Sequence, residues 1–163
     1  MEEIIEWTNL KKVLEDYAIA VRNTYQDNLI KSDRIASGDL LNSVEYIIQS
    51  DNMHISVSLQ LANYWRYVEW DTKPHWPPIN KIEEWIKIKP VVPDERDGKL
   101  PTEKQLAFLI SRKISEEGTK GSNDLHEAIE TVNDEYRELI RQAITLDIKS
   151  NFHTIFTEFF YKN

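Results

Sequence analysis

The stretch Asn63–Trp85, NYWRYVEWDTKPHWPPINKIEEW, holds four of the five tryptophans and three of the six prolines of the chain. Aromatic side chains supply large contact areas at low entropy cost, and proline fixes the backbone that carries them. We therefore expect a stiff, pre-organised platform. At least two of its four tryptophans are expected to lie in the core, and Trp85 is assigned to the fold rather than to a contact surface.

Before this stretch, apolar residues recur at three- and four-residue steps and predict a first helix over about residues 7–31. A turn over residues 35–43 follows, in which Gly38 can take a positive φ and Asp39 and Ser43 can bond nearby amides. Residues 44–49 and 54–61 then predict a β-hairpin. Its second strand alternates apolar with polar residues, which turns four side chains toward the core: Ile55, Val57, Leu59 and Leu61.

Within and after the stretch, a short helix is predicted over residues 64–70 and a longer one over residues 79–88, where prolines precede the helix start. Residues 89–101 are too rich in proline for a regular element. Thr102 and Gln105 form a weak capping box for the next helix, and residues 118–122 end it. From Leu125 the helical period holds nearly to the end, over some 50 Å at about 1.5 Å per residue, so we expect a bend or packing on another subunit.

These elements predict an α+β fold: a long N-terminal helix, a small antiparallel β-hairpin packed by helices, and a long C-terminal helix. With 163 residues, of which 40% are hydrophobic and 29% charged, we expect a single domain over 1–163. The core is expected over about 7–120 and a C-terminal helical extension over about 123–161.

Composition excludes several classes of function. No apolar run approaches the roughly 20 residues of a membrane helix, and Glu2 and Glu3 replace the basic start of a signal peptide, so we expect the chain to be soluble and to stay in the cytoplasm where it is made. The chain has no cysteine, which excludes disulfides, thiolate zinc sites and cysteine nucleophiles. A net charge of −8 argues against a protein that grips phosphate backbones.

Motifs for catalysis are weak throughout. Residues 118–122, GTKGS, resemble a phosphate loop only superficially, because a helix rather than a strand precedes them. The four histidines are scattered without metal-ligand spacing. Acidic pairs such as Glu83-Glu84 lie on stretches that read as solvated faces, and Ser37, Ser43 and Ser122 lack a nucleophile elbow. We therefore expect no catalytic residue, cofactor or metal.

The order of several motifs resembles a known family. Residues 35–43 (IASGDLLNS) come first and are followed by an alternating strand. Next come residues 64–69 (YWRYVE), residues 72–75 (TKPH), and then Pro77, Pro78, Ile82, Trp85 and Ile86. Residues 107–114 (AFLISRKI) and 117–120 (EGTK) complete the order. This order resembles the neck or tail-completion proteins of tailed bacteriophages, over about residues 35–120. The family pattern carries glycine before Thr-Lys-Pro, where this chain has Asp71. We expect Asp71 to tolerate left-handed backbone there or to bond its own loop.

The resemblance implies a non-enzymatic virion protein, synthesised in the host cytoplasm, that forms a homo-oligomeric ring in the neck or upper tail. Its partners are then portal, adaptor or tail proteins, and DNA passes through a lumen whose carboxylates prevent specific binding. Contacts are expected from the loops over residues 70–78 and 89–101 and from the C-terminal helix. The candidate interface residues are Tyr67, Trp70, Lys73, His75, Trp76, Pro77, Pro78, Val91, Val92, Arg96, Phe156, Phe159 and Phe160.

Two other functions stay open. The first is a small cytosolic phage or bacterial enzyme with a carboxylate site under the loop over residues 89–101. The second is an adaptor that binds a host protein through its tryptophans.

Overall fold

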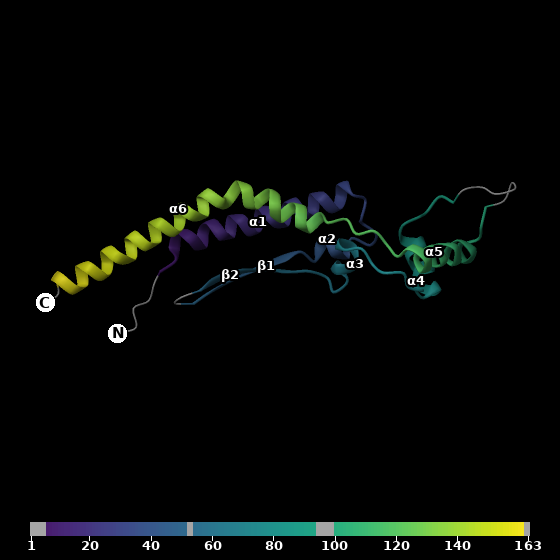
Figure 1. Cartoon of the computed structure of the whole chain (residues 1–163), viewed down its shortest axis with the longest axis horizontal. Helices are drawn as coiled ribbons and strands as arrows, with labels where there is room; N and C mark the ends of the chain where they lie inside the picture. The colour runs from purple at the N-terminus through teal and green to yellow at the C-terminus, as the bar shows by residue number, and fades with distance from the viewer. Residues whose placement is uncertain (1–5, 52–53, 94–99, 162–163) are drawn as a thin grey trace. The chain divides into compact units, whose positions relative to one another are not determined.

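The structure is a computed structural model that describes residues 6–51, 54–93 and 100–161. Its elements confirm the α+β class, with a long helix near each end of the described chain and a hairpin after the first (Figure 1). In chain order these elements are α1 (Thr8–Lys31), α2 (Asp39–Asn42), β1 (Glu45–Ser50), β2 (Ile55–Gln60), α3 (Trp65–Glu69), α4 (Ile79–Ile88), α5 (Glu103–Glu117) and α6 (Asp124–Tyr161).

Contacts divide the chain into two compact units, and each is assembled from segments that are far apart in the sequence. Unit 1 comprises Met1–Asn28, Val44–Leu61 and Leu125–Asn163, and unit 2 comprises Leu29–Ser43 and Ala62–Asp124. Unit 1 therefore holds most of α1, the hairpin and nearly all of α6, whereas unit 2 holds the tryptophan-rich stretch.

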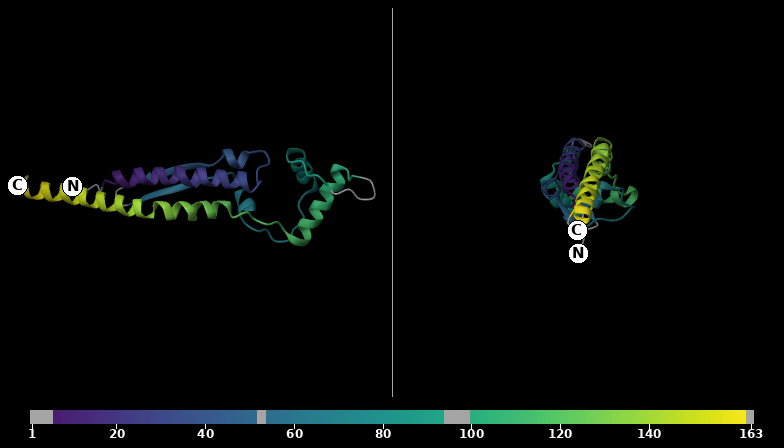
Figure 2. Two further views of the ribbon diagram at one scale, coloured as in Figure 1. Left: turned by 90° about the horizontal axis from the view of Figure 1, so that it is seen from above. Right: turned by 90° about the vertical axis from the view of Figure 1, so that its left-hand side faces the viewer.

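In unit 1, α1 and α6 lie side by side and run antiparallel (Figure 2). The predicted apolar stripes form the seam between them, because the buried side chains recur at helical spacing on both helices. From α1 these are Leu10, Ala18, Val21 and Tyr25, and from α6 they are Leu125, Ala128, Val132 and Ala143. The rings of Tyr17 and Tyr136 meet edge to face across the seam with centroids 5.8 Å apart.

Polar groups of α6 cap the start of α1. The buried carboxylate of Asp147 accepts the backbone N–H groups of Asn9 at 2.9 Å and Leu10 at 2.8 Å, and the side-chain amide of Asn9 at 2.7 Å. One turn later the Asn151 side chain exchanges two hydrogen bonds with the backbone of Glu6, both 3.0 Å long. The first N–H groups of a helix have no partner within it, so α6 supplies the cap that the sequence around Thr8 lacks.

The hairpin confirms the predicted alternation. β1 and β2 pair antiparallel, with Tyr46 opposite Leu59 and Ile48 opposite Val57. These four side chains are partly buried, whereas Ser56 and Ser58 on the other face are exposed. The Arg22 guanidinium of α1 lies 5.9 Å from the centre of the Tyr46 ring, a cation–π contact within the same unit.

Unit 2 confirms most of the local predictions. Gly38 has φ 84° at the start of α2, and the bounds of α4 match the predicted helix. Thr102 and Gln105 form the capping box of α5, since each side chain bonds the other residue's backbone N–H. α4 packs on α5 in this unit.

The C-terminal helical period forms one element. α6 has 38 residues and at about 1.5 Å per residue is roughly 57 Å long. No helix in the described part of the chain has both the length and the apolarity that crossing a membrane requires.

Candidate functional site

The aromatic platform of unit 2 is largely exposed. Tyr67 is 70% exposed, and Trp70 and Trp76 are each 51% exposed. The prediction that at least two of the four tryptophans lie in the core is wrong, because Trp65 is only half-buried and Trp85 is also partly exposed. Residues 70–78, between α3 and α4, form no helix that would turn every ring to one side, so Trp70 and Trp76 are presented to solvent.

Four of the predicted interface residues line one hollow. Tyr67, Trp70, Lys73 and His75 surround a space of about 400 Å³, together with Arg66, Asp71, Thr72 and Pro74. The Trp65 and Trp70 rings contact each other with centroids 5.2 Å apart, and the Arg66 guanidinium lies 5.7 Å from the Trp65 ring. The hollow therefore combines an aromatic wall with two basic side chains and a histidine. A surface of this composition is typical of protein–protein contacts.

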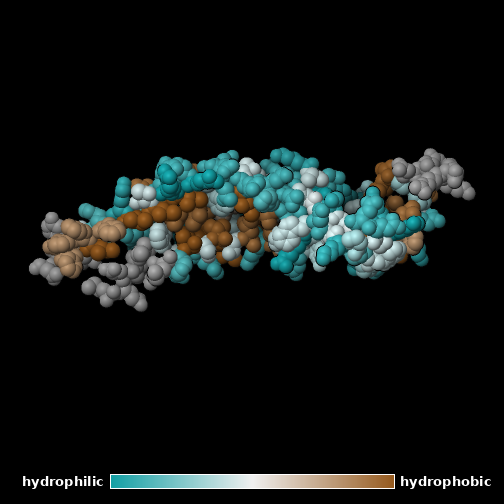
Figure 3. Space-filling view, in the orientation of Figure 1, coloured by the Kyte–Doolittle hydropathy of each residue, from teal (hydrophilic) through white to brown (hydrophobic). Residues whose placement is uncertain are grey.

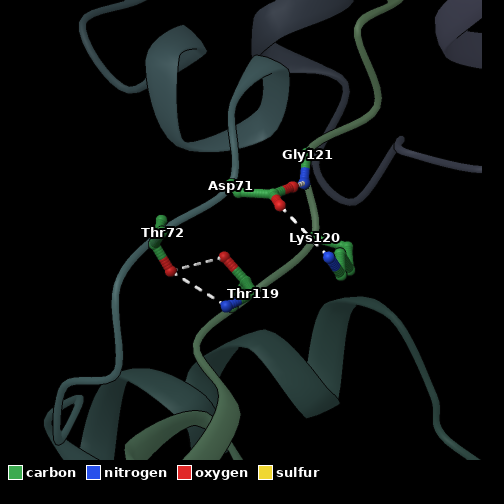
Figure 4. Close-up of polar contacts among 5 residues, drawn as sticks. All are labelled: Asp71, Thr72, Thr119, Lys120 and Gly121. Carbon is green, nitrogen blue, oxygen red and sulfur yellow. Dashed lines mark hydrogen bonds and ion pairs between the residues drawn. The ribbon is translucent and has the colours of Figure 1, made fainter.

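A backbone clasp holds this surface in place. Residues 68–72 run antiparallel to residues 119–123: Thr72 N–H donates to Thr119 O at 2.9 Å, and Ser122 N–H donates to Val68 O at 2.9 Å. Figure 4 shows the centre of the clasp, where the Thr72 hydroxyl lies 2.8 Å from the Thr119 hydroxyl and accepts the Thr119 N–H at 2.9 Å. Because the clasp includes the residues on both sides of Trp70, it fixes the backbone that presents this ring.

Asp71 ties the two strands of the clasp together through its side chain. Its carboxylate accepts the Gly121 N–H at 2.8 Å and the Lys120 ammonium at 3.2 Å (Figure 4). These two donors hold the pKa of Asp71 below its ordinary value of 3.8, the Gly121 hydrogen bond contributing most. The expected left-handed backbone is absent here, since Asp33 and Asn123 are the non-glycine residues with positive φ in the described chain. Asp71 bonds the segment after α5 rather than its own loop.

Two glycines allow the segments to approach this closely. A Cβ at Gly121 would lie 2.3 Å from Glu69 O, and a Cβ at Gly118 would lie 2.0 Å from Thr72 O. Gly118 also has φ 75°, a conformation that other residues rarely adopt. The GTKGS segment therefore acts as one strand of the clasp, which is consistent with the predicted inter-helix connection.

The next residues anchor the platform to α5. The Trp76 and Phe108 rings meet edge to face with centroids 5.7 Å apart. Pro77 is buried, so its predicted place in a contact surface is wrong. Pro78 is exposed and immediately precedes α4.

The remaining candidates lie elsewhere. Val91 is partly buried and Val92 is almost fully exposed, while Arg96 falls outside the described residues. Phe156, Phe159 and Phe160 are exposed on α6 and belong to unit 1, whereas the aromatic hollow belongs to unit 2.

A second cavity of unit 2, about 360 Å³, is mainly apolar. Leu40, Val68, Trp85 and Ile88 contribute to its lining, and Arg34, Asp39, Lys81 and Glu84 supply its charges. Among the described residues, no three His, Asp or Glu side chains are grouped as a metal site would require. The carboxylate site imagined under the loop over residues 89–101 lies partly outside the described chain.

Sequence reasoning missed three residues of this surface: Phe108, Thr119 and Gly121. For Thr119 and Gly121 the local signal is the pair of glycines that bracket Thr119-Lys120, because glycine often marks close approach of two backbones. These glycines give no signal for Phe108, which lies within α5. Comparisons with protein families, with curated proteins and with solved structures find no match to this chain.

Proposed function

We propose that the chain is a non-enzymatic structural component of a tailed bacteriophage, which forms a homo-oligomeric ring in the neck or upper tail and joins the portal or adaptor to the tail. The observation that carries this proposal is the exposed aromatic surface of Tyr67, Trp70 and Trp76, held by the Asp71–Gly121 clasp. The motif order over residues 35–120 supports the family, and the acidic composition supports a lumen that repels DNA.

The aromatic surface has the properties of an anchor in a larger interface. Aromatic side chains bury about 150–250 Å² each, so the exposed parts of Tyr67, Trp70 and Trp76 offer roughly 350 Å². Burying that area contributes about 9 kcal/mol before the cost of association, which is itself of similar size. Even taken together, these exposed areas are therefore too small for a stable pair, whose interface covers about 800 Å² per partner. A ring supplies the additional interface area, because each copy contacts two neighbouring copies as well as the proteins above and below the ring.

The rigidity of the surface supports the same function. A side chain that is already held in place loses little entropy when a partner covers it. The clasp fixes the backbone around Trp70, and the contact with Phe108 limits the movement of Trp76. Interfaces take most of their binding energy from a few such aromatic residues.

The test is incorporation into virions. Cells infected with the phage that encodes the chain would supply wild-type protein and a tagged W70S/W76S variant in competition, and the variant's share of purified particles would be measured. We expect a share at least about 10-fold below that of wild type, since two anchor residues are removed. The matched control is L139S, which removes a half-exposed apolar side chain from α6.

Circular dichroism establishes that both variants keep the wild-type helical content. Equal incorporation of folded W70S/W76S and wild-type protein would show that the aromatic surface is no assembly contact. If the chain is absent from virions and its tryptophans instead capture a host protein, the host-adaptor function replaces the one proposed.

A further inference from the structure

The last turns of α6 extend beyond its seam with α1. Among the described residues, the last polar contact of the seam is made by Asn151, which bonds the backbone of Glu6 just before α1 begins. Figures 1 and 2 show α6 continuing past the first turn of α1. Four of the five phenylalanines of the chain lie on this continuation, residues 152–160, which we call the overhang.

The overhang exposes an unusual amount of apolar surface. Phe152, Phe156, Phe159 and Phe160 are 71%, 59%, 68% and 59% exposed. At about 150–250 Å² per ring, they leave roughly 500 Å² uncovered, which is near the largest apolar patch of a typical monomer. Apolar side chains gather at this end of α6 in Figure 3. Covering this surface with neighbouring overhangs would bury about 1,000 Å² in total, counting both sides, which is the area that a specific interface requires.

The apolar arc of the overhang is too wide for a single neighbour. At about 100° per residue, Ile155, Phe159 and Phe152 fall within roughly 60° of one another and form one seam. Phe156 and Phe160 lie farther round the same side and widen the arc to about 140°. A two-helix seam is narrower than this, whereas a helix that touches two neighbours in a bundle needs such an arc.

Charge and hydrogen bonding indicate that other copies of the same segment cover the apolar face of the overhang. Residues 150–157, SNFHTIFT, contain no Lys, Arg, Asp or Glu, and Glu158 is the one charged residue of the overhang in a chain of net charge −8, so copies can meet here with little direct repulsion. The Thr154 and Thr157 hydroxyls bond the carbonyls of Ser150 and His153 in their own helix, so packing leaves them satisfied. A membrane-surface helix would instead carry Lys and Arg on its polar face.

We propose that the overhangs of several copies pack side by side and in parallel as a helical bundle. The parallel direction rests on the proposed ring, because cyclic symmetry brings equivalent helices together in the same orientation. Each overhang then uses the Phe152–Ile155–Phe159 seam toward one neighbour and the Phe156–Phe160 side toward the next. Such a bundle adds a subunit contact that is separate from the aromatic surface of unit 2.

Sedimentation velocity of the full chain over a range of concentrations tests self-association. The variant F152Q/F159Q removes the seam, and S150Q/T157Q places the same two glutamines on the opposite face of the same turns. We expect wild type and the control to associate, and the seam variant to need at least about 100-fold higher concentration, since two buried aromatic contacts are lost. Circular dichroism checks that all three proteins keep the same helical content.

Single cysteines test the direction, because the natural chain contains none. In a parallel bundle F152C, which lies near the middle of the apolar arc and therefore nearest the bundle axis, forms a disulfide between like positions of two copies under mild oxidation, whereas S150C does not. A wild-type chain that stays monomeric at about 100 µM, or equal association of the seam variant, would overturn the proposal. Cross-linking of F152C only with F159C, the position opposite it in an antiparallel pair, would overturn the parallel direction. If any of these results is obtained but the chain is still recovered from virions, the bundle is refuted and the proposed function is not.

Discussion

The cap that Asp147 provides at the start of α1 gives the sharpest test of how unit 1 is held together. Asp147 is 2% exposed and accepts three hydrogen bonds, from Asn9 N–H, Asn9 Nδ2 and Leu10 N–H. Its negative charge also lies at the helix N-terminus, where the aligned peptide dipoles favour it. The substitution D147A removes these bonds and leaves the buried Leu10 N–H and the part-buried donors of Asn9 without this acceptor.

The expected cost follows from the kinds of bond that are lost. A hydrogen bond to a charged group is worth about 1.5–3 kcal/mol, and removing an N-cap costs about 0.5–2 kcal/mol. The three bonds share one carboxylate and do not add independently, so we expect D147A to lower the free energy of unfolding by about 3 kcal/mol. That is a large part of the roughly 5–15 kcal/mol by which proteins of this kind are stable.

Urea denaturation followed by far-UV circular dichroism measures this loss. With a slope of about 2 kcal/mol per molar urea, the midpoint should fall by about 1.5 M. The matched control is D134A on the same helix, because the side chain of Asp134 is 78% exposed and forms its ion pair with nearby Arg137. We expect the control to lie within about 0.5 kcal/mol of wild type. A D147A midpoint equal to that of D134A would refute the capping role.

Three further predictions concern unit 2. Gly121→Ala should lower the free energy of unfolding by about 2 kcal/mol or more, because its Cβ would lie 2.3 Å from Glu69 O. Gly38→Ala should lower it by only about 1 kcal/mol, because the nearest atom to its Cβ would be 3.4 Å away. Thermal denaturation of the two variants compares these losses. Asp71 has a lowered pKa, so its contribution should be fully present above its ordinary pKa of 3.8 and disappear as the pH falls through the lower folded-state pKa. The difference in Tm between wild type and D71N should therefore be constant near neutral pH and vanish in acid; a difference that persists in acid would contradict this assignment. Trp76→Leu should lower the free energy of unfolding by about 1 kcal/mol, because the contact with Phe108 is lost. In a protein that already carries F108L, the same substitution should leave the free energy of unfolding unchanged, since that contact is already absent.

Local signals in the sequence were sufficient to predict most of the helices and strands. The start of α4 after Pro78, the capping box of Thr102 and the positive φ of Gly38 each depend on residues within one turn of each other. The alternation in β2 likewise needs only neighbouring residues. These features are predictable because their physical causes lie within a few residues.

The features that sequence reasoning missed depend on distant parts of the chain. Asp147 caps α1 from 138 residues away, and Asp71 bonds Gly121 from 50 residues away. The exposure of Trp70 and Trp76 depends on which segment the clasp places beside them, so composition alone suggested a more buried platform. An aspartate on the apolar stripe of α6 was nevertheless a readable signal, since a charge there requires a partner.

Quantitative mass spectrometry of purified virions tests the central claim most directly. The claim is that the aromatic surfaces of this chain serve assembly into a neck or tail ring. It predicts the chain at a fixed, ring-sized number of copies per particle, independent of how strongly the protein is expressed. Virions that are complete and infectious without the chain would contradict it.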